Sequence, residues 1–170
     1  QTGIIAERIV GPKNSDTGGI EVVSIINFHA ATNSLFYPGQ KNTDPGLHEI
    51  GYSLEESKDT KKWDFVRRED FYLDNNIKEG GKKQILSREV TKFDIEFLES
   101  ETALADGGFV ERWVKEWDSK ENECTNPDFK ENFCLPRAIK ISMSMKDEDE
   151  KIIYDTQVAN LCIPPCNSEI

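Results

Sequence analysis

Apolar and polar residues alternate along much of the chain, which is the pattern of β-strands that bury one face. The alternation is clearest in Arg137–Lys146, where every second residue from Ile139 to Met145 is apolar. Lys92–Ser100 alternates in the same way. Strands are therefore expected over Ile20–Phe28, His48–Glu56, Trp63–Phe71, Lys92–Ser100, Arg137–Lys146 and Lys151–Leu161.

Glycine, proline and acidic residues mark the turns between these strands. The run Asn14–Gly19 precedes the first strand, and Phe36–Leu47 is expected to be a loop because it holds the sequences PG and DPG. Asp147–Glu150 is expected to turn the chain between the last two strands.

The opening stretch Gly3–Val10 has a different spacing, with apolar pairs at Ile4-Ile5 and Ile9-Val10 separated by Glu7 and Arg8. This spacing predicts the last turns of an amphipathic helix. The following Gly11-Pro12 would end it, since glycine favours the left-handed cap and proline cannot continue a helix.

Phe109–Trp117 fits two structures. Val110, Trp113, Val114 and Trp117 follow the helical spacing i, i+3, i+4, i+7, while the odd positions also fit one face of a strand. The pattern alone slightly favours a helix.

A helix remnant followed by roughly seven strands indicates an α+β fold that is mostly β. The chain has 170 residues and a mass of 19.4 kDa, without an internal repeat or a strong linker, so residues 1–170 are expected to form a single domain.

The formal net charge is −11 and the isoelectric point is near 4.7. Such a chain gains no counterion release from nucleic acid phosphates and is poorly suited to anionic membrane surfaces. No apolar run approaches the roughly 20 residues of a membrane-spanning helix. The sequence begins at Gln1, so it is expected to be a processed form, a fragment or part of a longer chain.

Motifs for catalysis or cofactor binding are weak, and no cofactor is expected. There is no G-x-S-x-G motif, and the two histidines, His29 and His48, have no neighbours that make a site. Lys78–Lys83 holds a glycine pair but lacks the phosphate-loop spacing, so a turn with solvated lysines is expected.

The acidic residues also admit chemical interpretations. Asp147–Glu150 offers oxygen ligands for calcium but lacks the EF-hand pattern, so a solvated turn is favoured. Asp70 and Asp74 flank Tyr72 and resemble a glycosidase pair only weakly, because 32 acidic residues make such pairs inevitable.

Tryptophan and arginine residues are the remaining candidates for ligand binding. Trp63, Trp113 and Trp117 could stack on sugar rings, but core or rim packing is favoured. Arg67 and Arg68 could bind a carboxylate, but pairing with acidic neighbours on the negative surface is favoured.

Four cysteines, Cys124, Cys134, Cys162 and Cys166, are spaced C-x9-C and C-x3-C. Zinc sites prefer short spacings in both pairs, whereas an even count of cysteines favours two disulfides if the domain is exported. Three connectivities are possible, and we favour Cys124–Cys134 with Cys162–Cys166 over free thiols or a metal site.

Several segments occur in an order that matches one known family. The most specific is Leu135–Ile141, whose sequence LPRAIKI matches a strand of the form L-P-R/K-A-V/I-x-V. The others are Gly51–Leu54, Phe65–Asp70, Gln84–Val90, Lys92–Ser100 and the element from Gly107 to Trp113 and Trp117. Together, from about Tyr52 to Cys162, they resemble the J-type minor pseudopilins of the type II secretion system.

The resemblance implies a non-enzymatic subunit at the tip of the pseudopilus. It implies a long N-terminal helix that anchors the precursor in the inner membrane of a Gram-negative bacterium and is cleaved and methylated, followed by a periplasmic domain. Loss of most of that helix would explain why the sequence begins at Gln1 and why the expected helix over Gly3–Val10 is so short. The resemblance also favours a strand for Phe109–Trp117. The implied partners are the I- and K-type minor pseudopilins and the major pseudopilin, with no nucleic acid.

Two departures and two alternatives accompany the resemblance. Ser119–Phe133 is longer than expected and the tail Cys162–Ile170 is unusual; both could be surface elaborations held by disulfides. The alternatives are a W-class minor pilin of a type IV pilus and a secreted carbohydrate-binding β-sandwich module.

Overall fold

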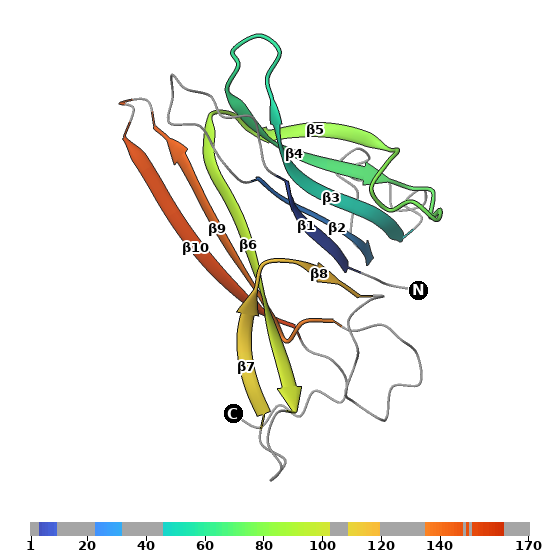
Figure 1. Cartoon of the computed structure of the whole chain (residues 1–170). Coiled ribbons are helices and arrows are strands. Elements are labelled where there is room, and N and C mark those ends of the chain that lie inside the picture. The colour runs from blue at the N-terminus through green and yellow to red at the C-terminus, as the bar shows by residue number, and fades with distance from the viewer. Residues whose placement is uncertain are drawn as a thin grey trace.

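Two antiparallel β-sheets make up the part of the chain that the computed structural model describes (Figure 1). The described residues are 4–9, 23–31, 46–102, 109–119, 135–147, 149 and 151–161. Among them there is no helix, which confirms the mostly β fold class.

The first sheet has six strands in the order β5-β4-β3-β2-β1-β8. In chain order they are β1 (Ile4–Ile9), β2 (Val23–Ala31), β3 (Leu47–Glu56), β4 (Trp63–Asp70), β5 (Lys82–Ser87) and β8 (Trp117–Asp118). The second sheet has four strands in the order β10-β9-β6-β7. They are β6 (Val90–Thr102), β7 (Phe109–Val114), β9 (Ala138–Lys146) and β10 (Ile152–Asn160).

The prediction of a helix over Gly3–Val10 is wrong, because Ile4–Ile9 is strand β1. This strand pairs with β2 on one side and with β8 on the other. Ile4 and Ala6 are both buried, and a spacing of two is the period of a strand face. A helix this short would be marginal alone, whereas neighbours on both sides give the strand backbone partners.

The strand interpretation of Phe109–Trp117 is confirmed, and the helix that the spacing favoured is wrong. The chain leaves the second sheet after Val114 and joins the first at Trp117, where β8 pairs with β1. Trp117 is buried while Val110 and Trp113 are exposed. The apparent helical period therefore combines apolar residues from two sheets.

The other predicted strands are confirmed with small shifts in their ends, and β5 was not expected from the pattern. The turn after the first segment, the predicted disulfide loops and nearly all of Phe36–Leu47 lie outside the described residues.

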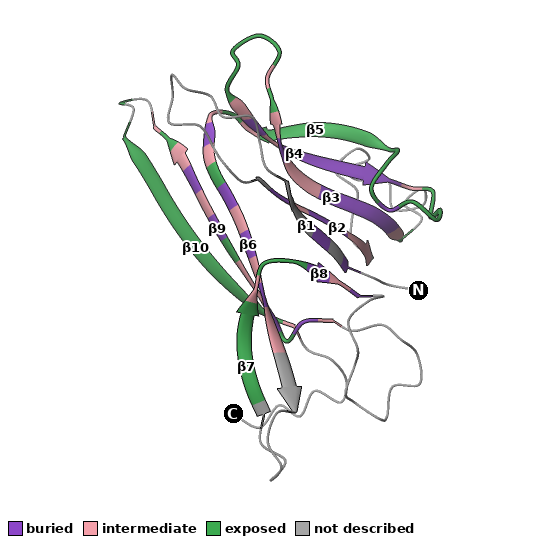
Figure 2. Ribbon diagram, in the orientation of Figure 1, coloured by how far each residue is buried: buried purple, intermediate pink, exposed green. Residues whose placement is uncertain are grey.

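The core lies where the long strand β6 crosses the first sheet (Figure 2). Phe93, Ile95 and Phe97 alternate along β6 and are almost completely buried. Phe93 packs on Phe65, with ring centroids 4.8 Å apart, and Phe97 packs on Trp117 at 6.1 Å. These aromatic contacts join the two sheets through their facing sides.

Candidate functional site

Charged side chains are buried on the core side of the first sheet, at one end of β3 and β4. In the register of these strands Leu54 faces Phe65, Tyr52 faces Arg67 and Ile50 faces Glu69. Residues that lie directly opposite on neighbouring strands point to the same face of the sheet. The side chains of Arg67 and Glu69 therefore lie on the same face of β4 as Phe65, which packs against the core.

Glu69 is held by two basic partners on this face. His48 Nδ1 lies 3.1 Å from Glu69 Oε1, and the guanidinium of Arg67 donates to Glu69 Oε2. The side chains of His48 and Glu69 have no exposed surface, and Phe71 packs on the His48 ring with centroids 5.1 Å apart. The carboxylate therefore has its polar contacts inside the protein, as a buried charge requires.

A second buried group lies on the opposite face of the same strands. Arg68 donates to Asn27 Oδ1 at 3.3 Å and lies 3.9 Å from Glu49 Oε2. Gly51 lies between these side chains, and a Cβ there would meet Asn27 Oδ1 at 2.6 Å. The close approach of Asn27 and Arg68 thus requires a glycine in β3. His29 Nε2 lies 3.7 Å from Glu49 Oε1.

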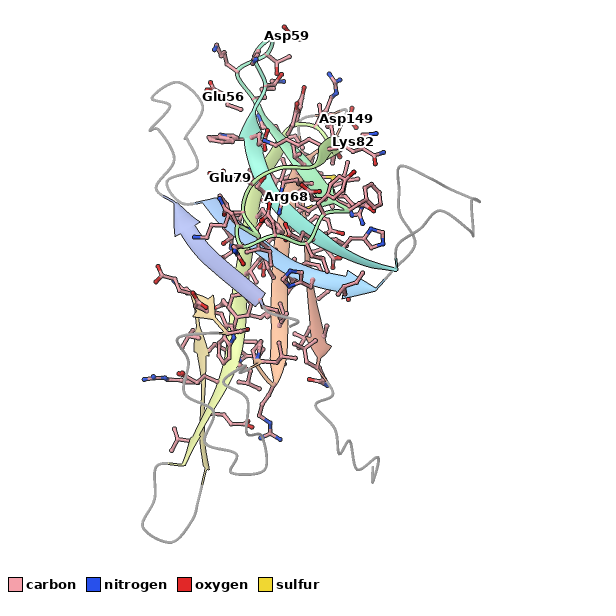
Figure 3. All side chains as sticks on the ribbon, turned by 90° about the vertical axis from the view of Figure 1, so that its right-hand side faces the viewer. Glu56, Asp59, Arg68, Glu79, Lys82 and Asp149 are labelled. Carbon is pink, nitrogen blue, oxygen red and sulfur yellow. The ribbon has the colours of Figure 1, made fainter. Side chains whose placement is uncertain are left out.

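Arg68 also holds the β4–β5 loop, residues 71–81, against this face (Figure 3). Its guanidinium donates to the backbone carbonyls of Ile77 and Glu79. Glu49 accepts from the backbone N–H of Asp74 at 3.1 Å. Buried side chains of the sheet therefore supply partners for loop backbone groups.

The loop presents two apolar side chains to solvent. Tyr72 is 81% exposed and Leu73 is 50% exposed. The backbone beside them is fixed, since Asp70 Oδ1 accepts from the Tyr72 N–H at 2.9 Å. Because the loop backbone is held in place, these two side chains are available for contact with another protein.

The arginine pairing that the sequence predicts is confirmed only in part. Arg67 and Arg68 do pair with carboxylates, but both are buried, so the surface location is wrong. Sequence reasoning missed the histidine–carboxylate contacts. One signal was available: the run RRED keeps both faces of β4 charged, which requires polar partners on each side.

The acidic pair Asp70 and Asp74 serves the loop backbone. Asp70 accepts from the Tyr72 N–H and Asp74 Oδ1 from the Asn76 N–H at 2.6 Å. These contacts are Asx-turns, in which each carboxylate bonds to the backbone two residues further on. The interpretation of Asp70 and Asp74 as a glycosidase pair is left without support.

An apolar cleft opens between the two sheets and encloses about 690 Å³. Its lining comes from β1, β2, β3, β4, β6, β9 and β10, and from residues that flank β9 and β10. Representative residues are Phe28, Tyr52, Phe65, Ile139, Met143 and Leu161. Almost all of this lining is apolar, so the cleft suits an apolar side-chain surface better than a charged substrate.

The tryptophans do not form a common platform. Trp117 is in the core, Trp63 packs at its margin and only Trp113 is exposed. Lys140 Nζ lies 4.7 Å from the centroid of the Trp113 ring, over its face. Core and rim packing is confirmed for Trp117 and Trp63, and the stacking of sugar on Trp113 would have to displace a cation–π contact.

Both predicted turns are present in the described residues. Gly80 and Gly81 have φ values of +77° and +71°, and Lys83 beyond them pairs with Glu55 at 2.7 Å. Asp147 Oδ1 accepts from the N–H groups of Asp149 and Lys151 at 3.0 and 2.8 Å. The Asp147 carboxylate therefore closes the hairpin turn.

The described residues contain neither a metal-binding cluster nor a membrane-spanning helix. No group of three or more His, Cys, Asp or Glu side chains there is arranged to hold a metal ion. Within the same residues no helix has the length and apolar character to cross a membrane. Cys124, Cys134, Cys162 and Cys166 lie outside them, so the disulfide pairing stays a prediction.

The sequence matches the model of a known protein family. The family model for the type II secretion system (T2SS) protein J matches residues 28–151, which is well over half of the chain. No curated protein matches the sequence. The match overlaps the segment from Tyr52 to Cys162 on which the resemblance rests and confirms it.

Proposed function

The chain belongs to the type II secretion system protein J family, and from this membership we propose that it is a non-enzymatic minor pseudopilin at the tip of the pseudopilus. The family match is the observation that carries the proposal. The core shared by both sheets supports treating residues 1–170 as a single structural domain. The subunit would act by assembly, and its described surfaces offer apolar contacts for this.

The proposed partners are the I- and K-type minor pseudopilins and the major pseudopilin. Two surfaces suit them: the exposed Tyr72 and Leu73 on the fastened loop, and the apolar cleft between the sheets. The net charge of −11 would influence the rate and orientation of docking more than the final affinity. The rate of binding should therefore depend on ionic strength, falling with added salt where the partner surface is basic and rising where it is acidic.

The proposed location is the periplasm, with an N-terminal helix anchoring the precursor in the inner membrane. The apolar cleft supports this, since its lining can pack against the apolar face of a helix. Cleavage and methylation of that helix belong to the same proposal. An oxidising periplasm would also permit the disulfides Cys124–Cys134 and Cys162–Cys166.

Deletion of the gene in the source bacterium tests the function. We expect proteins exported by the type II system to accumulate inside the cell, and the wild-type gene to restore their export. Restoration by a Leu73→Asp variant should be weaker than by Leu86→Asp, which alters an exposed leucine on β5. Unchanged export in the deletion strain would contradict the proposal.

A further inference from the structure

Strand β10 forms one edge of the four-stranded sheet and is exposed along its whole length (Figure 2). It pairs with β9 over all nine residues. Among the described residues no strand occupies its outer side. Four of its apolar side chains are more than half exposed: Ile152, Ile153, Tyr154 and Val158.

The hydrogen bonds at both ends of the hairpin show which backbone groups face outward. The Asp147 N–H donates to the Lys151 carbonyl, and the Leu161 N–H donates to the Arg137 carbonyl. Bonded and non-bonded pairs alternate along an antiparallel ladder. The odd-numbered residues of β10 therefore bond to β9, and the even-numbered residues direct their N–H and C=O groups away from it. The outward residues are Ile152, Tyr154, Thr156, Val158 and Asn160.

Other sheet edges in the described part of the chain carry features that discourage further pairing. Strand β5 begins with Lys82 and Lys83 and has a register shift against β4. Strand β8 has two residues, and β7 carries Glu111 and Arg112. Strand β10 has one charged residue, Asp155, and contains no lysine, arginine, glycine or proline. Such an edge is a ready template for another strand.

The sequence of β10 is complementary to itself. In an antiparallel pair of two copies centred on Thr156, Tyr154 faces Val158, which is a favourable aromatic and β-branched pair. Asp155 faces Gln157, so its carboxylate meets an amide rather than a second carboxylate. Gln157 Nε2 already donates to Asp155 within one copy, at 3.0 Å.

We propose that β10 pairs with β10 of a second copy of this chain, antiparallel and centred on Thr156, which joins the two four-stranded sheets into one continuous sheet. The outward N–H and C=O groups of each copy then bond to those of the other. An interface limited to one strand and its side chains is small, so the dimer forms at micromolar or higher concentrations. The inference is independent of the proposed secretion function.

Substitutions that place opposite charges at residue 156, the centre of the proposed strand pair, test this arrangement. Residue 156 faces its own counterpart in the second copy, so Thr156→Lys and Thr156→Asp each place like charges opposite one another. By sedimentation equilibrium, we expect wild-type chain to dimerise and each variant to have a dissociation constant raised by about tenfold. An equal mixture of the two variants should dimerise again, because opposite charges then meet.

Matched controls keep the test specific to this edge. Val110→Lys and Val110→Asp alter an exposed valine on β7 at the opposite edge of the sheet, and both should dimerise like wild type. A monomeric wild type up to millimolar concentration overturns the proposal. So does a mixture of the Thr156 variants that stays monomeric although circular dichroism shows both variants folded.

A measurement on the unmodified chain covers the case in which the Thr156 variants fail to fold, since Thr156 Oγ1 contacts Ser142 Oγ at 3.1 Å. Hydrogen exchange followed by NMR should show the outward amides becoming protected as the chain concentration rises. The amides of Asp155 and Gln157 should be protected at every concentration because they bond to β9. Protection of the outward amides only after a different protein is added would overturn pairing between copies.

Discussion

His48 and Glu69 lie in contact in the interior, with Nδ1 and Oε1 3.1 Å apart and neither side chain exposed. They join the ends of β3 and β4 at the point where the β4–β5 loop begins. The guanidinium of Arg67 meets the other oxygen of the same carboxylate. Each oxygen of the Glu69 carboxylate therefore lies beside a basic side chain of the protein interior.

The substitution Glu69→Gln should lower the free energy of unfolding by about 3 kcal/mol, because it leaves Arg67 buried without its counter-charge. Urea denaturation measures the loss. Glu55→Gln is the control, since Glu55 pairs with Lys83 on the surface and should cost less than about 1 kcal/mol. Equal losses in the two variants would contradict the structural role of Glu69.

Arg68→Lys should loosen the loop of residues 71–81. A single ammonium cannot replace the planar guanidinium that reaches the Ile77 and Glu79 carbonyls and Asn27 together. We expect about 2 kcal/mol less stability and faster tryptic cleavage after Lys78. Arg88→Lys, at an exposed position, makes the same chemical change and should alter neither measurement. Cleavage at the wild-type rate in Arg68→Lys would disprove the fastening role.

Substitution by alanine should lower the free energy of unfolding by different amounts at two glycines that have positive φ. Gly46 and Gly81 have φ values of +82° and +71°, so both variants carry a similar backbone strain of about 1 kcal/mol. A Cβ at Gly46 meets nothing within 4 Å, whereas one at Gly81 overlaps the carbonyl of Glu69. Gly81→Ala should therefore lose about 1–3 kcal/mol more than Gly46→Ala in denaturation experiments. Equal losses would show that the loop can move away from β4.

Hydrogen bonds from the Ser142 and Thr156 hydroxyls lower the pKa of the Tyr154 phenol below its usual value of 10.0. These donors stabilise the phenolate, so Ser142→Ala should raise the pKa toward that value. NMR titration of carbon-13-labelled tyrosine follows the change. Ser144→Ala is the control, because the Ser144 hydroxyl contacts Thr91 at 2.8 Å. A larger shift in the control than in Ser142→Ala would refute this arrangement of hydroxyls.

The sequence predicted best those strands whose alternation is complete. Strand β9 alternates without interruption, and its pairing with β10 follows from the short acidic turn between them. The first strand was mistaken for a helix because its burial depends on neighbours far along the chain, β2 and β8. A local pattern contains no information about such neighbours.

The run RRED indicates that β4 needs polar partners on both faces, but the sequence could not identify those partners for a similar reason. His48 and Glu69 are 21 positions apart, and the strand register alone brings them together. The guanidinium of Arg68 is bonded both to the loop of residues 71–81 and to Asn27 of β2, which are distant from one another in the sequence. The sequence interpretation placed Arg67 and Arg68 on the acidic surface and assigned no site to His48, whereas the fold buries all three side chains.

Mixing this chain with the periplasmic domains of the I- and K-type pseudopilins of the same bacterium tests the central claim most directly. Light scattering coupled to size-exclusion chromatography gives the mass of each species. Membership of the protein J family predicts one peak whose mass is the sum of the three chains. Separate elution of this chain at every salt concentration would contradict its assignment as an assembling tip subunit.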